Sequence, residues 1–349
     1  MPDLTAVPAP SSDAELDDAL SRPAPFVTDA LAAVPGDLLV LGAGGKMGLS
    51  LAAMARRALD AAGGSRRRVI AVSRFEKPGA TGPFQRAGVE TIASDLLADG
   101  ALAALPDADN VLFLAGMKFG STGNLPATWA MNTFLPGLVA RRFAGSRIVA
   151  LSTGNVYPLV TVASGGASEG DPVAPVGEYA ISCLGRERLF SYESEQRGTA
   201  VALIRLNYAN ALRYGVVTDI AGKVLRSEPI DLAMGHVNVI WQGDSNAQAL
   251  AAFPLASSPP LVLNVTGPET ASVRDVATRL AALLRAPSPV FVGTEAPTAL
   301  LSNAARASSL FGPPSVPLDR LLEWTASWLR SGGSLLDKPT GFEKRDGRF

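Results

Sequence analysis

The chain has 349 residues, enough for two domains or for one large α/β unit with an appended lobe. Hydrophobic residues make up 47% of it and charged residues 18%, a composition typical of a globular protein and not of a disordered one. Its 31 basic and 32 acidic side chains leave a net charge of −1, so no overall field attracts nucleic acid or an anionic membrane, and a small-molecule partner is expected.

Cysteine content and the first residues indicate a compartment. Cys183 is the only cysteine, so neither an intramolecular disulfide nor a cysteine-based zinc site can form, and a reducing environment fits best. The early residues are acidic, no short apolar run follows a basic region, and no stretch approaches 18 consecutive apolar residues. We therefore expect a soluble, cytoplasmic protein with no membrane span and no metal site.

Residues 1–36 are predicted to form an N-terminal helical extension, with a helical stretch from Asp13 to Leu31 that is interrupted near Pro23 and Pro25. From Asp37 onward, short apolar runs alternate with helical patterns. Runs that are apolar on both faces and spaced for crossover helices are typical of a doubly wound parallel sheet. The sequence therefore predicts an α/β fold with a Rossmann domain over residues 37–207. Its strands are expected at 38–41, 69–72, 111–114, 148–151 and 201–204, with a further strand before Ser94 that is counted as the third.

After about residue 207 the pattern loosens into turns and short elements, with helices expected near 244–253, 273–285 and 318–329. We interpret residues 208–335 as mainly a smaller C-terminal α/β lobe that binds the substrate. The apolar run at 261–265 is expected to add a strand to either lobe. Residues 336–349 are charged and are expected to form a surface tail.

A glycine-rich loop follows the first predicted strand and opens a helix. Glycines allow a tight turn and let the backbone approach a pyrophosphate, while the helix offers unpaired N–H groups and the positive end of its dipole. A strand, a glycine loop and a helix in this order predict a dinucleotide site. The residues of this loop that we expect to bind the cofactor are Gly42, Gly44, Gly45, Lys46, Met47 and Gly48.

The ends of the second and third strands bear on the choice of cofactor. An acidic residue at the end of the second strand usually holds a free ribose 2′-hydroxyl, but here the strand ends in Ser73 and Arg74. Arg74 can pair with a 2′-phosphate and Lys46 adds a second cation, so NADP is favoured and NAD is possible; alternatively, Arg74 is a solvated loop residue. Asp95, next to Leu96, is expected either to accept a hydrogen bond from the adenine or to cap a helix.

Three further segments share a pattern with a known family: Leu114-Ala115-Gly116 after the fourth strand, Ser152-Thr153-Gly154-Asn155-Val156-Tyr157 after the fifth, and Glu178-Tyr179-Ala180-Ile181-Ser182 at the start of a helix. Together with the glycine spacing, they make residues 37–329 resemble the extended short-chain dehydrogenases/reductases. That family includes NAD(P)-dependent sugar epimerases, dehydratases and reductases. The resemblance implies hydride transfer on a hydroxyl or carbonyl group of a sugar-like substrate, with residues 114–116 beside the cofactor.

The resemblance also assigns catalytic roles. It implies that Thr153 orients the substrate oxygen and that Tyr179 moves the proton and contacts the cofactor. The family pairs this tyrosine with a lysine four residues later, on the same helical face, which lowers the pKa of the phenol. Here Cys183 stands at that position, and a thiol offers no positive charge. Lys118 lies in a loop that faces the cofactor in the family, so it is our candidate for the missing charge; a surface lysine is the alternative.

Two other outcomes remain open. In the first, proton transfer has moved to other groups. His236, the only histidine, is then a candidate substrate-binding or catalytic residue in the second lobe, and Cys183 is a weaker candidate. Alternatively, the chain is a dinucleotide-bound sensor or scaffold that has lost catalytic power. Asn132 is expected to support the cofactor site, and Asn207, at the end of the sixth strand, is expected to meet the substrate.

The resemblance further implies a homodimer in which the helices that carry Asn132 and Tyr179 pack against their copies. The charged stretch 185–190 of the second helix is either part of this contact or solvated. A nucleotide-sugar substrate needs cations for its diphosphate, and Arg213, Lys223 and Arg226 are close enough in sequence to contribute. Free sugars, sugar acids and lactones are equally open.

Overall fold

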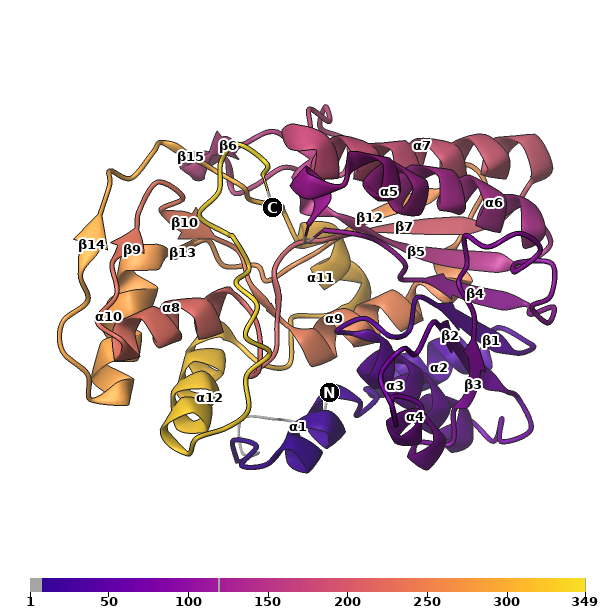
Figure 1. Ribbon diagram of the computed structural model, residues 1–349, viewed down its shortest axis with the longest axis horizontal. Helices are drawn as coiled ribbons and strands as arrows, with labels where there is room; N and C mark the ends of the chain where they lie inside the picture. The colour runs from indigo at the N-terminus through magenta and orange to yellow at the C-terminus, as the bar shows by residue number, and fades with distance from the viewer. Residues whose placement is uncertain (1–7, 119, 349) are drawn as a thin grey trace.

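A computed structural model describes residues 8–118 and 120–348, and it shows a larger lobe built on one sheet beside a smaller lobe of helices and short strands (Figure 1). The sheet has seven parallel strands in the order β12-β7-β5-β4-β1-β2-β3. Their bounds are β1 Leu38–Leu41, β2 Val69–Ser73, β3 Glu90–Ala93, β4 Asn110–Phe113, β5 Arg147–Thr153, β7 Val201–Leu206 and β12 Leu261–Val265. This confirms the predicted doubly wound sheet.

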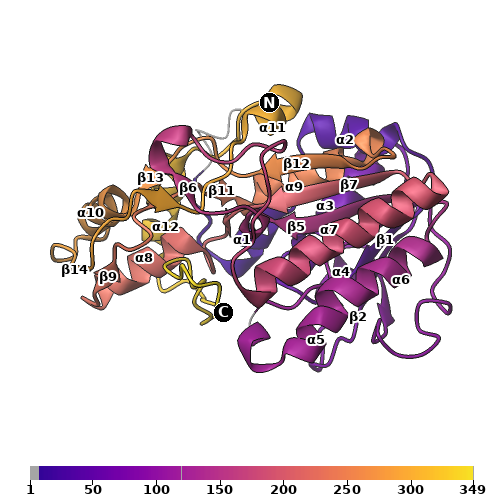
Figure 2. The same cartoon turned by 90° about the horizontal axis from the view of Figure 1, so that it is seen from above.

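The central strands are apolar on both sides because helices cover both faces of the sheet. All four residues of β1 and of β4 are buried. Helices α2 (Pro25–Ala32), α3 (Gly48–Ala61) and α9 (Gln242–Ala251) pack on one face, and α6 (Leu135–Arg142) and α7 (Gly177–Arg197) pack on the other (Figure 2). The short helices α4 (Gly82–Arg86) and α5 (Leu125–Trp129) complete this lobe. The order of the strands reverses between β1 and β4, which places a crevice at their carboxyl ends.

The second lobe has its own hydrophobic core, in which Trp241 and Trp324 meet edge to face at 5.4 Å. Helix α1 (Asp13–Leu20) belongs to this core through Leu16 and Leu20, so the N-terminal extension supports both lobes. The other helices of this lobe are α8 (Val216–Leu225), α10 (Val273–Leu284) and α12 (Leu318–Arg330), whereas α11 (Ala305–Phe311) packs beside β12 on the first lobe. The short strand pairs are β8 (Ala209–Asn210) with β11 (Ile240–Trp241), β9 (Ile230–Asp231) with β14 (Phe291–Val292), β10 (His236–Val237) with β13 (Ala271–Ser272), and β6 (Val160–Thr161) with β15 (Thr298–Ala299).

The chain crosses between the lobes more than once. It leaves the sheet after β7, returns with α9 and β12, and then enters the second lobe again with β13. The two lobes therefore do not correspond to two continuous segments divided at residue 207. The predicted division treated the chain as sequential, whereas the apolar faces of α9 and β12 are buried against the first lobe.

The charged C-terminal segment is not the surface tail that the sequence predicted. From α12 it runs between the two lobes, drawn in yellow in Figure 1, and its buried residues include Thr340 and Phe342, which is 1% exposed. Phe342 lies in the core of the second lobe. The prediction failed because the segment is charged on average, while its two buried residues are only a small part of it. The last residue of the predicted tail, Phe349, and residues 1–7 of the predicted extension lie outside the described residues.

Across the described ranges, no helix combines the length and the apolar character that crossing a membrane requires.

Candidate functional site

The glycine loop lies at the carboxyl edge of the sheet, between β1 and α3, as predicted. Gly42 has a φ of +85°, and a Cβ atom there would lie 2.5 Å from the backbone nitrogen of Ala115. A Cβ atom at Gly48 would lie 1.9 Å from the carbonyl oxygen of Ala43. These two glycines are therefore required by the close packing of the loop itself. A Cβ at Gly45 would meet only the Gly42 carbonyl oxygen, at 3.6 Å, so this position opens outward.

The start of α3 fits an anionic group. This helix has 14 residues, no side chain caps its N-terminus, and no acidic residue lies in its first turn. Its unpaired N–H groups and the positive end of its dipole are thus not compensated by the protein. Such a helix start next to a glycine loop suits the pyrophosphate of a dinucleotide. The residues present therefore fit the cofactor that the sequence predicts.

The two cations predicted to bind a 2′-phosphate, Arg74 and Lys46, do not converge on one site. Arg74 is exposed, and its Nη1 lies 3.2 Å from Oε1 of Glu76, so this guanidinium already has a counter-charge. Lys46 points toward the second lobe: its Nζ donates to the carbonyl oxygen of Ala209 at 2.9 Å and lies 4.4 Å from the ring centroid of Tyr214. The geometry therefore does not support the NADP preference that was based on these two residues.

The remaining residues predicted around the cofactor lie along the same edge. Ser73 is half-buried beside the glycine loop, since a Cβ at Gly44 would lie 2.4 Å from its Oγ. Asp95 is exposed, and its Oδ1 accepts a hydrogen bond from the backbone of Leu97 at 3.1 Å. The segment that follows is a turn and not a helix, so the helix-cap alternative is wrong, and the contact with the adenine stays a prediction. The others flank the loop after β4 or pack in the core below it: Leu96 and Ala115 are buried, Leu114 and Met47 are half-buried, and Gly116 is exposed.

Thr153, Tyr179 and Cys183 meet at the end of β5 and the first turns of α7. Thr153 is the last residue of β5, and its Oγ1 accepts hydrogen bonds from the backbone and the side-chain amide of Asn155 at 3.2 and 3.0 Å. The Tyr179 hydroxyl forms side-chain hydrogen bonds with Thr153 and with Cys183, one helical turn away. The predicted pair of Thr153 and Tyr179 is therefore assembled, with the thiol beside the phenol.

Burial decides the protonation of this group. It raises the pKa of Tyr179 well above its ordinary value, and Cys183 raises it further, while Arg186 and the bond with Thr153 lower it. Burial also raises the pKa of the Cys183 thiol, which is fully enclosed. Both groups are consequently protonated at neutral pH. Tyr179 thus carries its proton at neutral pH but is a weaker acid than a free phenol, and Cys183 lacks the thiolate character that a nucleophile needs.

Lys118 reaches this group, as predicted. Its Nζ lies 5.9 Å from the ring centroid of Tyr179 and donates a hydrogen bond to the carbonyl oxygen of Thr340 at 3.1 Å. Desolvation lowers the pKa of Lys118 to about 8, while Cys183 and Asp219 oppose this decrease. The ammonium is therefore mostly charged at pH 7 and stands on the side of the C-terminal segment. A surface position for Lys118 is ruled out by these contacts.

A second cation, Arg186, was missed by the sequence analysis. It lies two helical turns after Tyr179 on α7, is 6% exposed, and donates to the carbonyl oxygen of Leu151 at 2.6 Å. Its charge lowers the pKa of both Tyr179 and Cys183. The charged stretch 185–190 was expected at a dimer contact or in solvent, yet Arg186 and Glu187 are buried inside the subunit. The seven-residue spacing from Tyr179 was the available signal, because it returns to the same helical face.

Asn132 supports the site indirectly. It lies in a π-helical turn, Ala130–Phe134, and is completely buried. Its Nδ2 donates to the Met117 carbonyl and the Ser182 hydroxyl at 2.9 and 3.0 Å, and its Oδ1 accepts from the Met117 backbone and from Arg186 at 2.7 and 3.1 Å. The amide thus uses its hydrogen-bonding capacity on the protein, so direct cofactor contact is not supported. Asn132 instead fixes the loop that carries Lys118.

The two residues predicted to meet the substrate take different positions. Asn207 is 1% exposed, and a Cβ at Gly154 would lie 3.2 Å from its Cγ, so it packs beneath the site instead of opening onto it. His236 lies in β10 of the second lobe, where its backbone pairs with Ser272. Neither residue shares an element with Thr153 or Tyr179. A role for His236 in substrate binding stays a prediction.

A buried ion pair lies below the reaction group. Nη2 of Arg205 is 2.8 Å from Oε2 of Glu187, and the two side chains are 8% and 5% exposed. Glu187 also accepts from the hydroxyl of Ser152 at 2.5 Å, and Arg205 donates to the hydroxyl of Tyr157 at 2.7 Å. This network ties β5, β7 and α7 together and keeps Thr153 and Tyr179 in register.

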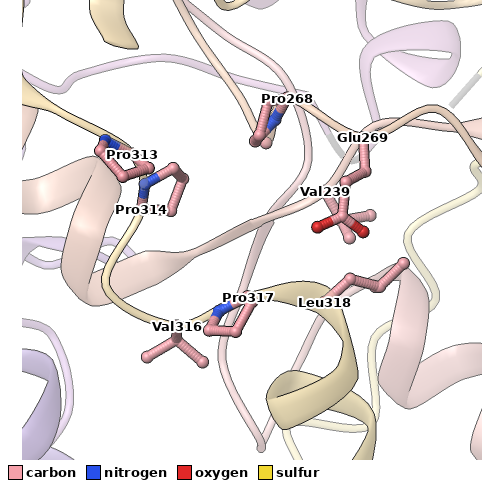
Figure 3. Close-up of a pocket in the computed structure, with 9 residues that line it drawn as sticks. Val239, Pro268, Glu269, Pro313, Pro314, Val316, Pro317 and Leu318 are labelled. Carbon is pink, nitrogen blue, oxygen red and sulfur yellow. The ribbon is translucent and has the colours of Figure 1, made fainter. Parts of the chain in front are cut away.

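Other features lie away from this group. A cavity of about 90 Å³ between the end of β12 and the start of α12 is lined by prolines and by Glu269 (Figure 3), and none of the predicted site residues lines it. Within the described part of the chain, no three His, Cys, Asp or Glu side chains are grouped so that they could hold a metal ion. The site chemistry is therefore concentrated at the carboxyl edge of the sheet.

No protein-family model matches the sequence, and no curated protein matches it. The fold, however, is similar to solved structures. MoeE5 in complex with UDP-glucose and NAD is 20% identical, with a TM-score of 0.67 over 85% of this chain and 99% of that one. UDP-glucuronic acid 4-epimerase from Bacillus cereus, in complex with UDP-glucuronic acid and NAD, is 19% identical, with a TM-score of 0.68 over 84% and 99%.

A short-chain dehydrogenase/reductase superfamily protein from Agrobacterium tumefaciens with bound NAD is 19% identical, with a TM-score of 0.69 over 84% of this chain and 97% of that one. These likenesses extend over both lobes and agree with the resemblance seen in the sequence. The chain therefore has the fold of the extended short-chain dehydrogenases/reductases.

Proposed function

We propose that this chain is an enzyme that binds a nicotinamide dinucleotide and acts by hydride transfer on a hydroxyl or carbonyl group of a sugar or sugar-derived compound. The observation that carries the proposal is the convergence of Thr153, Tyr179 and Lys118 at the edge of the sheet that also bears the glycine loop. Ligands of open α/β sheets collect at this edge, where the strand order reverses. The similar solved structures, whose names include sugar-nucleotide epimerases with NAD, support the same reading.

The glycine loop and the start of α3 would hold the dinucleotide, which would supply hydride transfer at this edge of the sheet. Thr153 then orients the substrate oxygen, and Tyr179 donates or removes the proton of that oxygen. Because burial favours the neutral phenol, proton removal needs nearby positive charge, which Lys118 and Arg186 supply. Cys183 hydrogen-bonds with the phenol but adds no charge.

We propose NAD in preference to NADP. Glu76 neutralises Arg74 and would repel a 2′-phosphate, and Lys46 is engaged with the second lobe. The similar structures with bound NAD favour the same choice.

The proposal is tested by mixing the purified chain with NADH and a panel of keto sugars, and with NAD and sugars that carry a free hydroxyl. Cofactor absorbance reports net hydride transfer, and NMR of the sugar reports epimerisation or dehydration without net cofactor change. We expect turnover that Tyr179→Phe and Thr153→Ala reduce by about 100-fold or more. Tyr192→Phe, an exposed tyrosine on the same helix, serves as the matched control.

The alternative, a dinucleotide-bound sensor or scaffold, gives a different result. Such a protein binds the dinucleotide but changes neither the cofactor nor any sugar, and Tyr179→Phe has no effect on it. That outcome would contradict an enzymatic role.

We also propose a homodimer through the helices that carry Asn132 and Tyr179. Exposed apolar side chains gather on these elements: Leu125, Trp129, Phe134, Ile181 and Tyr192, of which Phe134 is 59% exposed. Several large apolar side chains exposed on neighbouring elements are typical of a protein interface.

A further inference from the structure

The C-terminal strap, residues 336–348, runs past the reaction group, from Lys118 to the start of α7. It passes between the two lobes (Figure 1), and the carbonyl oxygen of Thr340 accepts the hydrogen bond from Lys118. Farther along, Gly347 packs against the N-terminus of α7, so a Cβ at Gly177 would lie 2.6 Å from the Gly347 carbonyl oxygen. The strap therefore contacts both sides of the reaction group.

The strap is fixed by buried anchors. Oδ2 of Asp219 accepts hydrogen bonds from the backbone and the hydroxyl of Thr340, at 2.7 and 2.6 Å, and Phe342 is enclosed in the second core. The guanidinium of Arg345 donates to the carbonyl oxygens of Ala233 and Thr298 at 2.9 and 2.7 Å. Anchors of this number and burial are those of a permanent wall and not of a loosely placed terminus.

The cations that the sequence offered for a diphosphate already have carboxylate partners. Glu343 forms an ion pair with Lys223, and its charge raises the pKa of the neighbouring Asp219, whose carboxyl is already perturbed by burial. The two carboxylates therefore lie near each other, and both are engaged with groups of the protein. The three cations that the sequence offered for a diphosphate are all engaged: Lys223 with Glu343, Arg213 with Asp13 and Asp17, and Arg226 with Glu228.

We infer that the C-terminal strap sets the substrate class: the cleft takes a free sugar or polyol and excludes a nucleotide diphosphate. The strap occupies the space beside Lys118, and the three cations that could have held a diphosphate are paired with carboxylates instead. This inference rests on the proposed function, because it names the substrate class of the same site. It separates this chain from the similar structures that hold UDP-sugars.

The test measures binding of UDP and of UDP-glucose to the full chain by calorimetry, without any dinucleotide. The wild-type chain should show no saturable binding at about 1 mM. Two full-chain variants release the strap: Glu343→Gln/Arg345→Ala keeps Phe342 in its core, and Phe342→Ala removes that anchor. Both should bind UDP at least about tenfold more tightly than the wild type. Arg348→Ala, an exposed position on the same segment, should behave as the wild type does.

Limited proteolysis reports strap release directly, through faster cleavage within residues 336–348 of the two release variants. Micromolar binding of UDP by the wild-type chain would overturn the inference. So would unchanged UDP affinity in variants whose strap is cleaved faster, because the strap would then not be what excludes the nucleotide.

In a parallel assay with dinucleotide, free sugars should be turned over and their UDP derivatives should not. Absence of turnover on every compound would count against the proposed function. The UDP binding measurements do not depend on turnover, so they test the inference about the strap separately. The two failures are therefore distinguishable.

Discussion

Replacing Lys118 by methionine removes the positive charge next to Tyr179 while keeping a side chain of similar length. The ammonium lies 5.9 Å from the centre of the phenol ring. At an effective dielectric constant of about 20, a unit charge at this separation stabilises the phenolate by about 3 kcal/mol. This corresponds to about 2 units in the pKa of Tyr179 and to about 100-fold in a rate that depends on the phenolate.

The pH dependence gives a sharper signature than the rate alone. Because burial lowers the pKa of Lys118 to about 8, its charge is present below that pH and is lost as the pH rises through it. Wild-type turnover should therefore decline above about pH 8. Lys118→Arg retains its charge to beyond pH 12, so its decline should be absent, and Lys118→Met should be slow at every pH.

The assay follows kcat from pH 6 to pH 10 for the wild type and both variants, with dinucleotide affinity measured at each pH to separate binding from turnover. A wild-type rate in Lys118→Met would refute the reasoning. The same decline above pH 8 in Lys118→Arg would refute it too, since the decline would then belong to another group.

Three further predictions follow from the buried ion pair, the apolar helix face and the exposed Arg74. Glu187→Gln leaves the buried Arg205 without its counter-charge, so chemical denaturation should show a free energy of unfolding that is lower by about 3–5 kcal/mol. The exposed control Glu195→Gln should lower it by less than about 0.5 kcal/mol, and equal losses in the two variants would argue against a structural ion pair. Phe134→Glu should convert a dimer into a folded monomer in light scattering, and a wild-type monomer would contradict the interface. Arg74→Ala should change NADH and NADPH affinity by less than about threefold, whereas a selective tenfold loss for NADPH would restore the NADP hypothesis.

The fold was predictable because buried parallel strands appear in sequence as short, continuous apolar runs at regular spacing. The five predicted runs correspond to β1, β2, β4, β5 and β7, and the glycine loop lies where a strand and a helix meet. The lobe to which residues 261–265 belong could not be predicted, because an apolar run alone does not indicate which sheet edge is free to accept a strand. The structure places them beside β7.

The site was predictable where its residues are close in sequence or share a motif, as Thr153 and Tyr179 do. Lys118 was identified as a candidate, but its hydrogen bond to Thr340 spans 222 residues and no local pattern reveals it. The position of the strap could not be predicted for the same reason: its composition is mostly charged, and nothing local indicates that Phe342 is buried. Arg74 misled because its counter-charge, Glu76, lies only two residues away and was not considered.

The central claim is that the glycine loop binds a nicotinamide dinucleotide, and titration with NADH and NADPH, followed by cofactor fluorescence, tests it most directly. The matched variants are Gly45→Val, which adds a side chain where the loop opens outward, and Gly170→Val, a glycine with no neighbour within 4 Å. We predict saturable NADH binding in the wild type and in Gly170→Val, with a loss of at least about tenfold in Gly45→Val. No binding to the wild type, or binding that Gly45→Val leaves unchanged, would contradict the claim.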